Sequence, residues 1–239
     1  MLINNKNIET AYPLSPMQSG FLFQSLYAPD SDAYFVQSIF ELDGEIDIAV
    51  LKEAWQTISN HHPILRTGFI WEDGAESEQY VLESAVIPFT AEDWQALTEA
   101  EQSQKLKSFI EADRQKGFDL AKAPLFRLTI IQCNSNKYYL IWSQHHILMD
   151  GWSTPIILGD AFKAYENLRL EQEVQLTSRP PYRDYIAWLQ KQDLNKAEIF
   201  WKSYFTSLEE PTRLSFNDII KEKPEKDYQM IGNFFGLGI

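Results

Sequence analysis

The four histidines of this chain fall into two adjacent pairs, His61-His62 and His145-His146. The second pair follows an apolar run that is typical of a strand, and it precedes Asp150 by a few residues. Because successive strand residues point to opposite faces, one imidazole of this pair should face a cleft and the other the interior. A histidine held by a turn at a strand end is well placed for acid–base chemistry near neutral pH.

The turn after the second pair leaves several roles open. Gly151 permits a backbone conformation that a side chain would obstruct, or a close approach by a ligand, and Asp150 is near enough to stiffen the turn. A histidine pair at a strand end is more often structural than catalytic. A metal site needs three or four ligands, more than this segment clearly supplies, so no metal is predicted. A serine hydrolase of the nucleophile-elbow type is excluded, since no Gly-x-Ser-x-Gly occurs.

The elements that must position the histidines can be predicted from hydrophobic periodicity and turn residues. Helices are predicted over residues 17–27, 48–60, 97–116, 153–170, 182–192 and 198–208. Strands are predicted over residues 34–42, 64–71, 79–82, 126–133 and 138–144. Strands and helices are interleaved, which indicates an α/β fold or an α+β sandwich.

Composition excludes several classes of partner. The chain has 239 residues, is 44% hydrophobic and carries a formal net charge of −13, so we expect no nucleic-acid binding, which depends on basic side chains. No apolar run approaches the roughly 18 residues of a membrane helix, and no membrane association is predicted. Cys133 is the only cysteine, which fits a reducing compartment. These features, with a polar start that lacks a signal peptide, predict a cytoplasmic protein.

Motifs in a fixed order connect the histidine turn to a known family. The segment His145–Gly151 matches the pattern HHxxxDG, which other acyltransferases share. With the flanking segments, the chain resembles the condensation domains of non-ribosomal peptide synthetases. The further segments that match are Leu14–Gly20, His62–Thr67, Phe118–Arg127 and Tyr182–Trp188.

The resemblance covers roughly residues 11–215 and implies a fold. The family domain is about twice as long and has two lobes, each similar to a chloramphenicol acetyltransferase subunit. We expect residues 1–175 to form the first lobe, an α/β sandwich with one mixed open sheet flanked by helices. Residues 176–239 would be the incomplete start of a truncated second lobe with an atypical tail. That tail vaguely echoes a later family motif, which hints at a deletion, a frameshift or a fragment.

The resemblance also implies a reaction. A donor acyl or peptidyl thioester meets an acceptor aminoacyl thioester, each carried on the phosphopantetheine arm of a peptidyl carrier protein, and the acceptor amine forms an amide. The partners would be the donor and acceptor carrier proteins and adjacent synthetase domains. No covalently bound cofactor is expected. His146 would be the catalytic histidine, while His145 packs inward. Asp150 would form an ion pair with Arg66, and Gly151 would leave room for the pantetheine arm.

Some features depart from the pattern or refine it. His61 stands where many family members have arginine. Residues 15–18, 21–24 and 211–214 resemble domains that accept a donor ending in a D-residue. Two other functions stay open: a CoA-dependent acyltransferase of the same fold, and a non-catalytic lobe that only docks carrier proteins. The truncated chain alone is expected to be inactive.

Overall fold

The structure of the chain is a computed structural model that describes residues 7–29, 31–72 and 76–208. Backbone contacts divide the chain into two compact units, whose described parts are residues 7–187 and 188–208. The histidine pairs, Asp150, Gly151 and Arg66 all lie in the first unit. Whether a lobe boundary falls near residue 175 stays a prediction.

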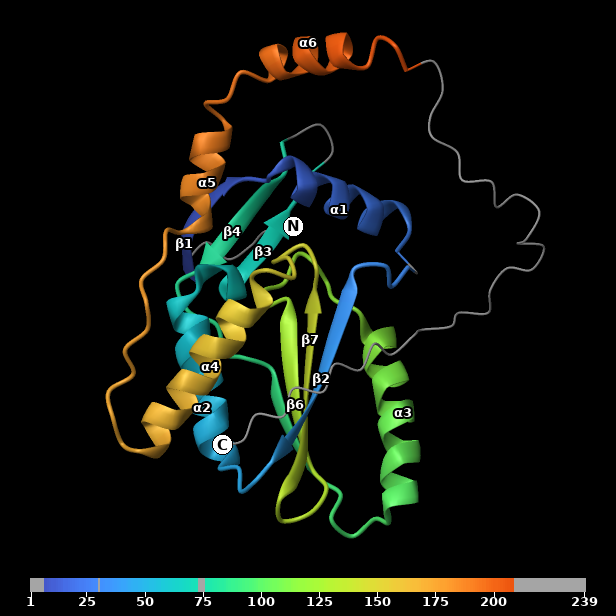
Figure 1. The fold of residues 1–239 in the computed structure, drawn as a ribbon, viewed down its shortest axis with the longest axis vertical. Helices are drawn as coiled ribbons and strands as arrows, with labels where there is room; N and C mark the ends of the chain where they lie inside the picture. Colours follow the sequence, from blue (N-terminus) through green and yellow to red (C-terminus); the bar gives the residue numbers. More distant parts are fainter. Residues whose placement is uncertain (1–6, 30, 73–75, 209–239) are drawn as a thin grey trace, which may run out of the picture. The chain divides into compact units, whose positions relative to one another are not determined.

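Strands and helices are interleaved along the chain, in agreement with the predicted α/β class (Figure 1). The strands are β1 (Ile8–Pro13), β2 (Phe35–Asp43), β3 (Thr67–Ile70), β4 (Glu78–Leu82), β5 (Phe89–Asp93), β6 (Phe126–Gln132) and β7 (Lys137–His145). The helices are α1 (Pro16–Tyr27), α2 (Ile48–His61), α3 (Glu99–Lys116), α4 (Thr154–Arg169), α5 (Tyr182–Leu189) and α6 (Leu194–Tyr204), with a 3-10 helix, η2, over Pro63–Arg66.

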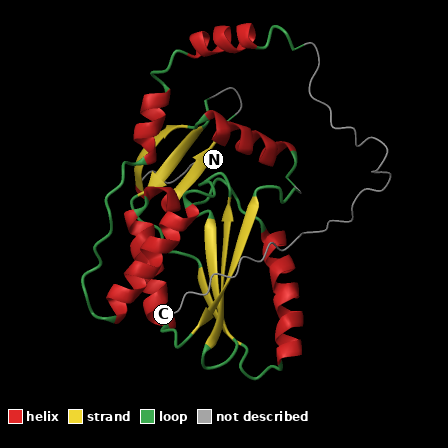
Figure 2. Cartoon of the chain, in the orientation of Figure 1, coloured by secondary structure: helices red, strands yellow, loops and turns green. Residues whose placement is uncertain are grey.

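The larger sheet carries the histidine turn. It has four strands in the order β2-β7-β6-β5, and only the β5–β6 pair is parallel. Helices α2 and α4 cover one face and α3 covers the other (Figure 2). Strand β7 serves both faces: Leu140 and Trp142 belong to the main core, while Ile141 belongs to a smaller cluster with Trp94 and Ile131. This sheet, packed on both sides, is a rigid support for the residues at the end of β7.

A second sheet of three strands, β1-β4-β3, corrects the expectation of a single sheet. Strand β1 pairs with β4, which also pairs with β3, and neither joins the larger sheet. Neither β1 nor β5 was predicted, because both are edge strands that leave many side chains partly exposed and so lack a strong apolar alternation. The predicted class, with mixed open sheets flanked by helices, is nevertheless confirmed.

Local hydrogen bonds explain two further differences from the predicted elements. Residues 63–66 form η2, so the strand that follows begins at Thr67. Helix α6 begins at Leu194, earlier than predicted, because the Asp193 side chain accepts a hydrogen bond from the Lys196 backbone and caps it. No helix in the described part of the chain is both long and apolar enough to cross a membrane.

Candidate functional site

The histidine turn is fixed by backbone hydrogen bonds on both sides of β7. The His145 N–H donates to the Leu125 carbonyl at 3.0 Å, and the His146 N–H donates to the Tyr34 carbonyl at 2.8 Å. Two segments distant in sequence therefore hold the two histidines. The turn also closes on itself, since the Leu148 N–H donates to the His145 carbonyl at 3.2 Å.

His145 is the inward member of the pair and is 8% exposed. Its Nδ1 accepts a hydrogen bond from the Ile147 N–H at 3.2 Å, which leaves the proton of the neutral ring on Nε2. That nitrogen lies 3.5 Å from the Ser25 hydroxyl, which in turn donates to the Phe21 carbonyl at 2.8 Å. Burial, and to a smaller extent the adjacent His146, lowers the pKa of His145 to about 4. A ring that stays neutral at pH 7 is suited to hold the strand end.

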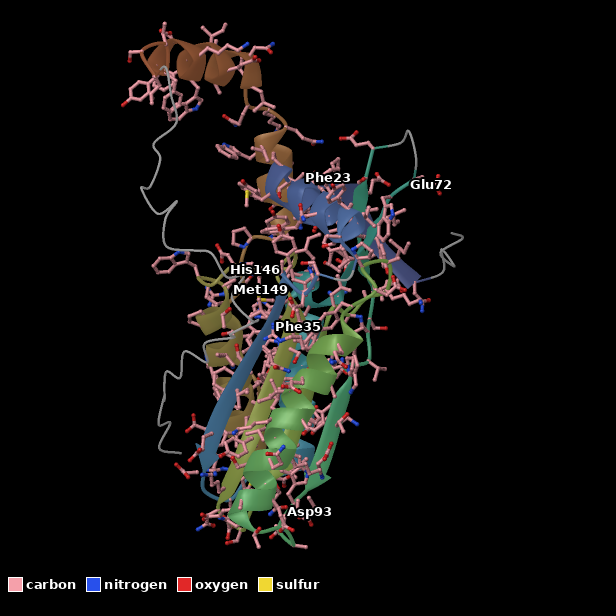
Figure 3. All side chains as sticks on the ribbon, turned by 90° about the vertical axis from the view of Figure 1, so that its right-hand side faces the viewer. Phe23, Phe35, Glu72, Asp93, His146 and Met149 are labelled. Atoms are coloured by element: carbon pink, nitrogen blue, oxygen red, sulfur yellow. The ribbon has the colours of Figure 1, made fainter. Side chains whose placement is uncertain are left out.

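His146 is only half-buried and lies at the end of β7 near α1, next to Met149 (Figure 3). Its ring centroid is 5.7 Å from that of Phe21, which also packs against Tyr34 at 4.7 Å. Within the described residues, no group forms a hydrogen bond with the His146 imidazole. Among the described residues, both ring nitrogens are therefore without a hydrogen-bond partner, which is compatible with general acid–base chemistry.

The expected ion pair between Asp150 and Arg66 is wrong. Asp150 is exposed, and its Oδ1 accepts hydrogen bonds from the N–H groups of Trp152 and Ser153, at 3.1 and 3.0 Å, and from the Ser153 hydroxyl at 2.9 Å. These bonds, with the Ser153 hydroxyl contributing most, lower the pKa of Asp150. The carboxylate thus orders the turn that leads into α4, because a short acidic side chain can accept hydrogen bonds from backbone N–H groups two or three residues further on.

Arg66 is buried elsewhere, between α2 and the smaller sheet. Its Nε donates to the Ser59 carbonyl at 3.0 Å, and Nη1 donates to Glu9 at 3.0 Å and to the Leu82 carbonyl. The guanidinium faces the carbonyl groups at the end of α2, a position that favours a cation. Its planar fork is therefore fully engaged away from the histidine turn.

Gly151 lies in open space. A Cβ added there would meet no atom within 4 Å, and its backbone has no positive φ. The conformational reason that the sequence suggested for this glycine is therefore excluded. The other suggestion, close approach by a ligand, stays a prediction.

Helix α1, which supplies Phe21 and Ser25, is fixed by the motif at its start. Ser15 and Gln18 form a capping box, with hydrogen bonds of 3.2 and 3.0 Å between each side chain and the other residue's N–H. The Gln18 amide also exchanges hydrogen bonds with the buried Gln79 amide of β4 at 3.0 and 2.8 Å. This motif therefore sets the position of α1 against the smaller sheet, and through it the packing around His146.

The other histidine pair forms a structural contact that sequence reasoning missed. His62 is buried, and its Nε2 lies 2.8 Å from Asp160 Oδ2 on α4. Burial lowers the pKa of His62 in spite of this hydrogen bond. His61 lies 3.1 Å, through its Nε2, from the Thr177 carbonyl. Within the described residues, no three His, Cys, Asp or Glu side chains are grouped so that they could hold a metal ion.

The missed residues gave different signals. Phe21 has helical spacing with its neighbours, which predicts a helix but not a contact with His146. Tyr34 and Ser25 reach the turn only through the tertiary fold, and Asp160 lies in a helix whose partner is far away in sequence. Such contacts depend on how separate helices and strands pack together, and local sequence patterns do not reveal that packing.

The fold and the turn together define an α/β lobe that presents an accessible histidine beside a helix. A model of the condensation domain family matches residues 8–231 of the chain. A linear gramicidin synthase protein of Brevibacillus parabrevis is 42% identical over 215 residues, which are 90% of this chain and 4% of that protein. Bacitracin synthase 1 of Bacillus licheniformis is 37% identical over 211 residues, 88% of this chain and 4% of that protein. The chain belongs to the condensation domain family.

Solved structures support the same fold. The starter condensation domain of rhizomide synthetase matches with a TM-score of 0.75 at 21% identity, over 85% of this chain and 50% of that chain. The first condensation domain of the calcium-dependent antibiotic synthetase, in complex with a substrate analogue, matches with a TM-score of 0.71 at 17% identity over similar shares. The chain thus spans about half of the condensation domain structures and about 4% of the length of the synthases that it matches.

Proposed function

We propose that this chain is the histidine-bearing lobe of a domain that forms amide bonds in non-ribosomal peptide synthesis. A donor acyl or peptidyl thioester and an acceptor aminoacyl thioester would react, each presented by the phosphopantetheine arm of a carrier protein. The observation that carries this proposal is the His146 imidazole, which no described residue hydrogen-bonds, in an HHxxxDG turn held from both sides. The names of the relatives, which are peptide antibiotic synthases, support the same class of product.

In this proposal His146 acts on the attacking amine. A free α-amino group has a pKa of about 7.7–8.0, so a substantial fraction is already neutral near pH 7. His146 is therefore not needed as a strong base on the free amine. It would orient the amine by a hydrogen bond or take the proton that the nitrogen carries once it has attacked. Such a positioned group contributes roughly 10²–10⁴-fold in rate.

The surroundings of the turn suit this role. The open space at Gly151 is where a pantetheine arm would pass, and neutral His145 adds no charge beside His146. Asp150 and Arg66 would act only on the structure of the lobe, through their separate hydrogen-bond networks.

A finer proposal concerns the donor. Residues 15–18 and 21–24, which resemble domains that accept a donor ending in a D-residue, lie on α1 and its cap, and Phe21 of this helix contacts the His146 ring. In this proposal helix α1 would touch the donor near the reacting carbonyl. The third supporting segment, residues 211–214, lies outside the described residues.

The second lobe is required in this account. Rate acceleration by positioning depends on holding both reactants together, and effective molarities reach roughly 10⁵–10⁸ M when the geometry is right. One lobe supplies His146 but not the opposing wall that would confine both arms. The 239-residue chain alone would then be inactive, although it could still dock carrier proteins.

The test uses purified carrier proteins loaded with donor and acceptor. They are offered to this chain and to a version extended by a second lobe, with donors that end in a D- or an L-residue. Dipeptidyl carrier should form only with the extended protein, faster with the D-donor, and fall about 10²-fold or more in His146→Ala. Product from the 239-residue chain at a comparable rate would contradict the need for a second lobe. Faster product from acyl-CoA and a free amine would instead favour a CoA-dependent acyltransferase.

A further inference from the structure

A single buried carboxylate joins three strands directly below the histidine turn. Asp113 lies on α3 and is 3% exposed. Its Oδ2 accepts hydrogen bonds from the Ser143 hydroxyl at 2.6 Å and from the Gln37 amide at 2.8 Å, and its Oδ1 accepts from Arg127 Nε at 2.6 Å. The three donors are register partners on neighbouring strands, since Ser143 of β7 pairs with Gln37 of β2 on one side and Arg127 of β6 on the other.

The Arg127 side chain ties the same row to the end of α3. Besides Asp113, its guanidinium donates to the Gly117 carbonyl at 2.8 Å, just past the last residue of the helix. A cation is favoured at this end because the last carbonyl groups of a helix carry partial negative charge. The guanidinium also lies over the Phe118 ring at 4.5 Å. Phe118 and Arg127 are the first and last residues of the family motif Phe118–Arg127. Both ends of this segment therefore lie at the end of α3.

The next row of the sheet contains His145. Ser143 and His145 are two residues apart on β7 and so face the same side of the sheet, and His145 is the register partner of Phe35. The Phe35 ring packs against Phe118 at 5.6 Å and lies 5.3 Å from the Arg127 guanidinium. Phe35, the register partner of His145, therefore packs on the guanidinium that Asp113 holds.

We propose that Asp113 is a positioning residue for the histidine turn. Through Ser143 and Arg127 it fixes the row of strands from which His145 and His146 project. Backbone hydrogen bonds hold the end of β7 on both sides, and the Asp113 network adds side-chain bonds one row away. The 3.2 Å bond from the Ile147 N–H to His145 Nδ1 depends on the position of that strand end. Loss of the carboxylate also leaves the largely buried Arg127 cation without its partner. Its effect on amide formation rests on the proposed function, whereas its effect on the histidine geometry does not.

The test reads the geometry of His145 directly, in the chain as it is. In ¹⁵N-labelled protein, a ring nitrogen that accepts a hydrogen bond and one that carries the proton give well-separated signals, so the pair of His145 signals reports the tautomer. The variants are Asp113→Asn and the milder Ser143→Ala, which removes one bond and leaves the Asp113–Arg127 pair in place. The matched control is Asp160→Asn, another buried aspartate, which bonds His62 on the opposite face of the sheet.

Asp113→Asn and Ser143→Ala should both bring the two His145 signals closer together, because the proton is no longer fixed on Nε2. Asp160→Asn should leave them as in the parent even though its melting temperature falls. Parent-like His145 signals in Ser143→Ala and Asp113→Asn would overturn the proposal. If Asp113→Asn does not fold, the Ser143→Ala result decides.

A second experiment measures amide formation by the two-lobed domain with carrier-bound substrates. Ser143→Ala and Asp113→Asn should lower kcat roughly 10- to 10²-fold with KM little changed, because a misplaced group affects the chemical step more than binding. An active parent whose variants keep full kcat would overturn the role in the reaction. An inactive parent would count against the proposed function alone, since the His145 signals still test the positioning.

Discussion

The two histidine pairs have the same sequence pattern and opposite structural roles. His61-His62 ends helix α2, and its second member is buried and bonded to Asp160. His145-His146 ends strand β7, and its second member is half-exposed, with no hydrogen bond from the described residues to its ring. A strand end sends consecutive side chains to opposite faces, which explains how one pair supplies both a support and an accessible imidazole. The element that carries the pair, and not the pair itself, decides which histidine stays partly exposed.

The two buried histidines, His62 and His145, are poorly suited to proton transfer near neutral pH because their pKa values are lowered. Burial is the main cause of the lowered pKa in both. For His62 the Asp160 carboxylate partly opposes this effect, while His145 has no such partner among its causes and its pKa falls to about 4. A general acid–base group works best with a pKa near the operating pH, so His145 and His62 are suited to structural roles.

The largest expected effect on stability is at His62. His62→Ala should lower the free energy of unfolding by about 3 kcal/mol or more, because it removes a buried ring and leaves the buried Asp160 carboxylate without its hydrogen-bond donor. Chemical denaturation measures this. The adjacent His61→Ala is the matched control and should cost less than about 1 kcal/mol, since it removes a partly exposed ring with one hydrogen bond and one ring contact, to His62. If both variants lost the same free energy of unfolding, His62 would not be the structural member of this pair.

Acid should destabilise the protein through His145. Its pKa is about 4 when folded, against an ordinary value of 6.5, so the unfolded chain binds the extra proton between these values. Its contribution is therefore present above pH 6.5 and is lost as the pH falls towards 4, by about 3 kcal/mol in all. The stability difference between the parent and His145→Gln should shrink over this range. Parallel stability–pH curves for the two proteins would show that His145 is not held neutral.

The corrected partners of Arg66 and Asp150 give a third prediction. Arg66→Met should cost about 2–3 kcal/mol, because it leaves buried carbonyl groups without donors. Asp150→Ala should cost about 1 kcal/mol, because it removes the hydrogen bonds that order the turn before α4. The two losses should add to within about 0.5 kcal/mol in the double variant, since the residues share no bond. A coupling free energy well above that value would indicate that Arg66 and Asp150 do interact, which would contradict their separate partners in the structure.

Several features of the fold and site were predictable from the sequence because they depend on local patterns. Two runs rich in strand-forming residues, on either side of the polar residues 134–136, indicated the β6–β7 hairpin, and the histidine turn after it was expected where it lies. The partners of Arg66 and Asp150 were not predictable, since a guanidinium or a carboxylate can be satisfied by many nearby backbone groups. The Asp113 network was hidden for another reason: in sequence α3 is a charged helix, and only its packing on the sheet shows that one of its acidic side chains faces inward.

The smallest expected effect on stability, and the largest on rate, is at His146. The measurement that tests the account most directly compares His146→Gln with His62→Gln in the two-lobed domain. It determines the melting temperature of each and the single-turnover rate with donor- and acceptor-loaded carrier proteins. We expect His146→Gln to melt within a few degrees of the parent while its rate falls about 10²-fold or more, and His62→Gln to melt well below the parent with its rate nearly kept. A His146→Gln variant that loses stability but retains the parent's rate would contradict the assignment of His146 as the reactive histidine.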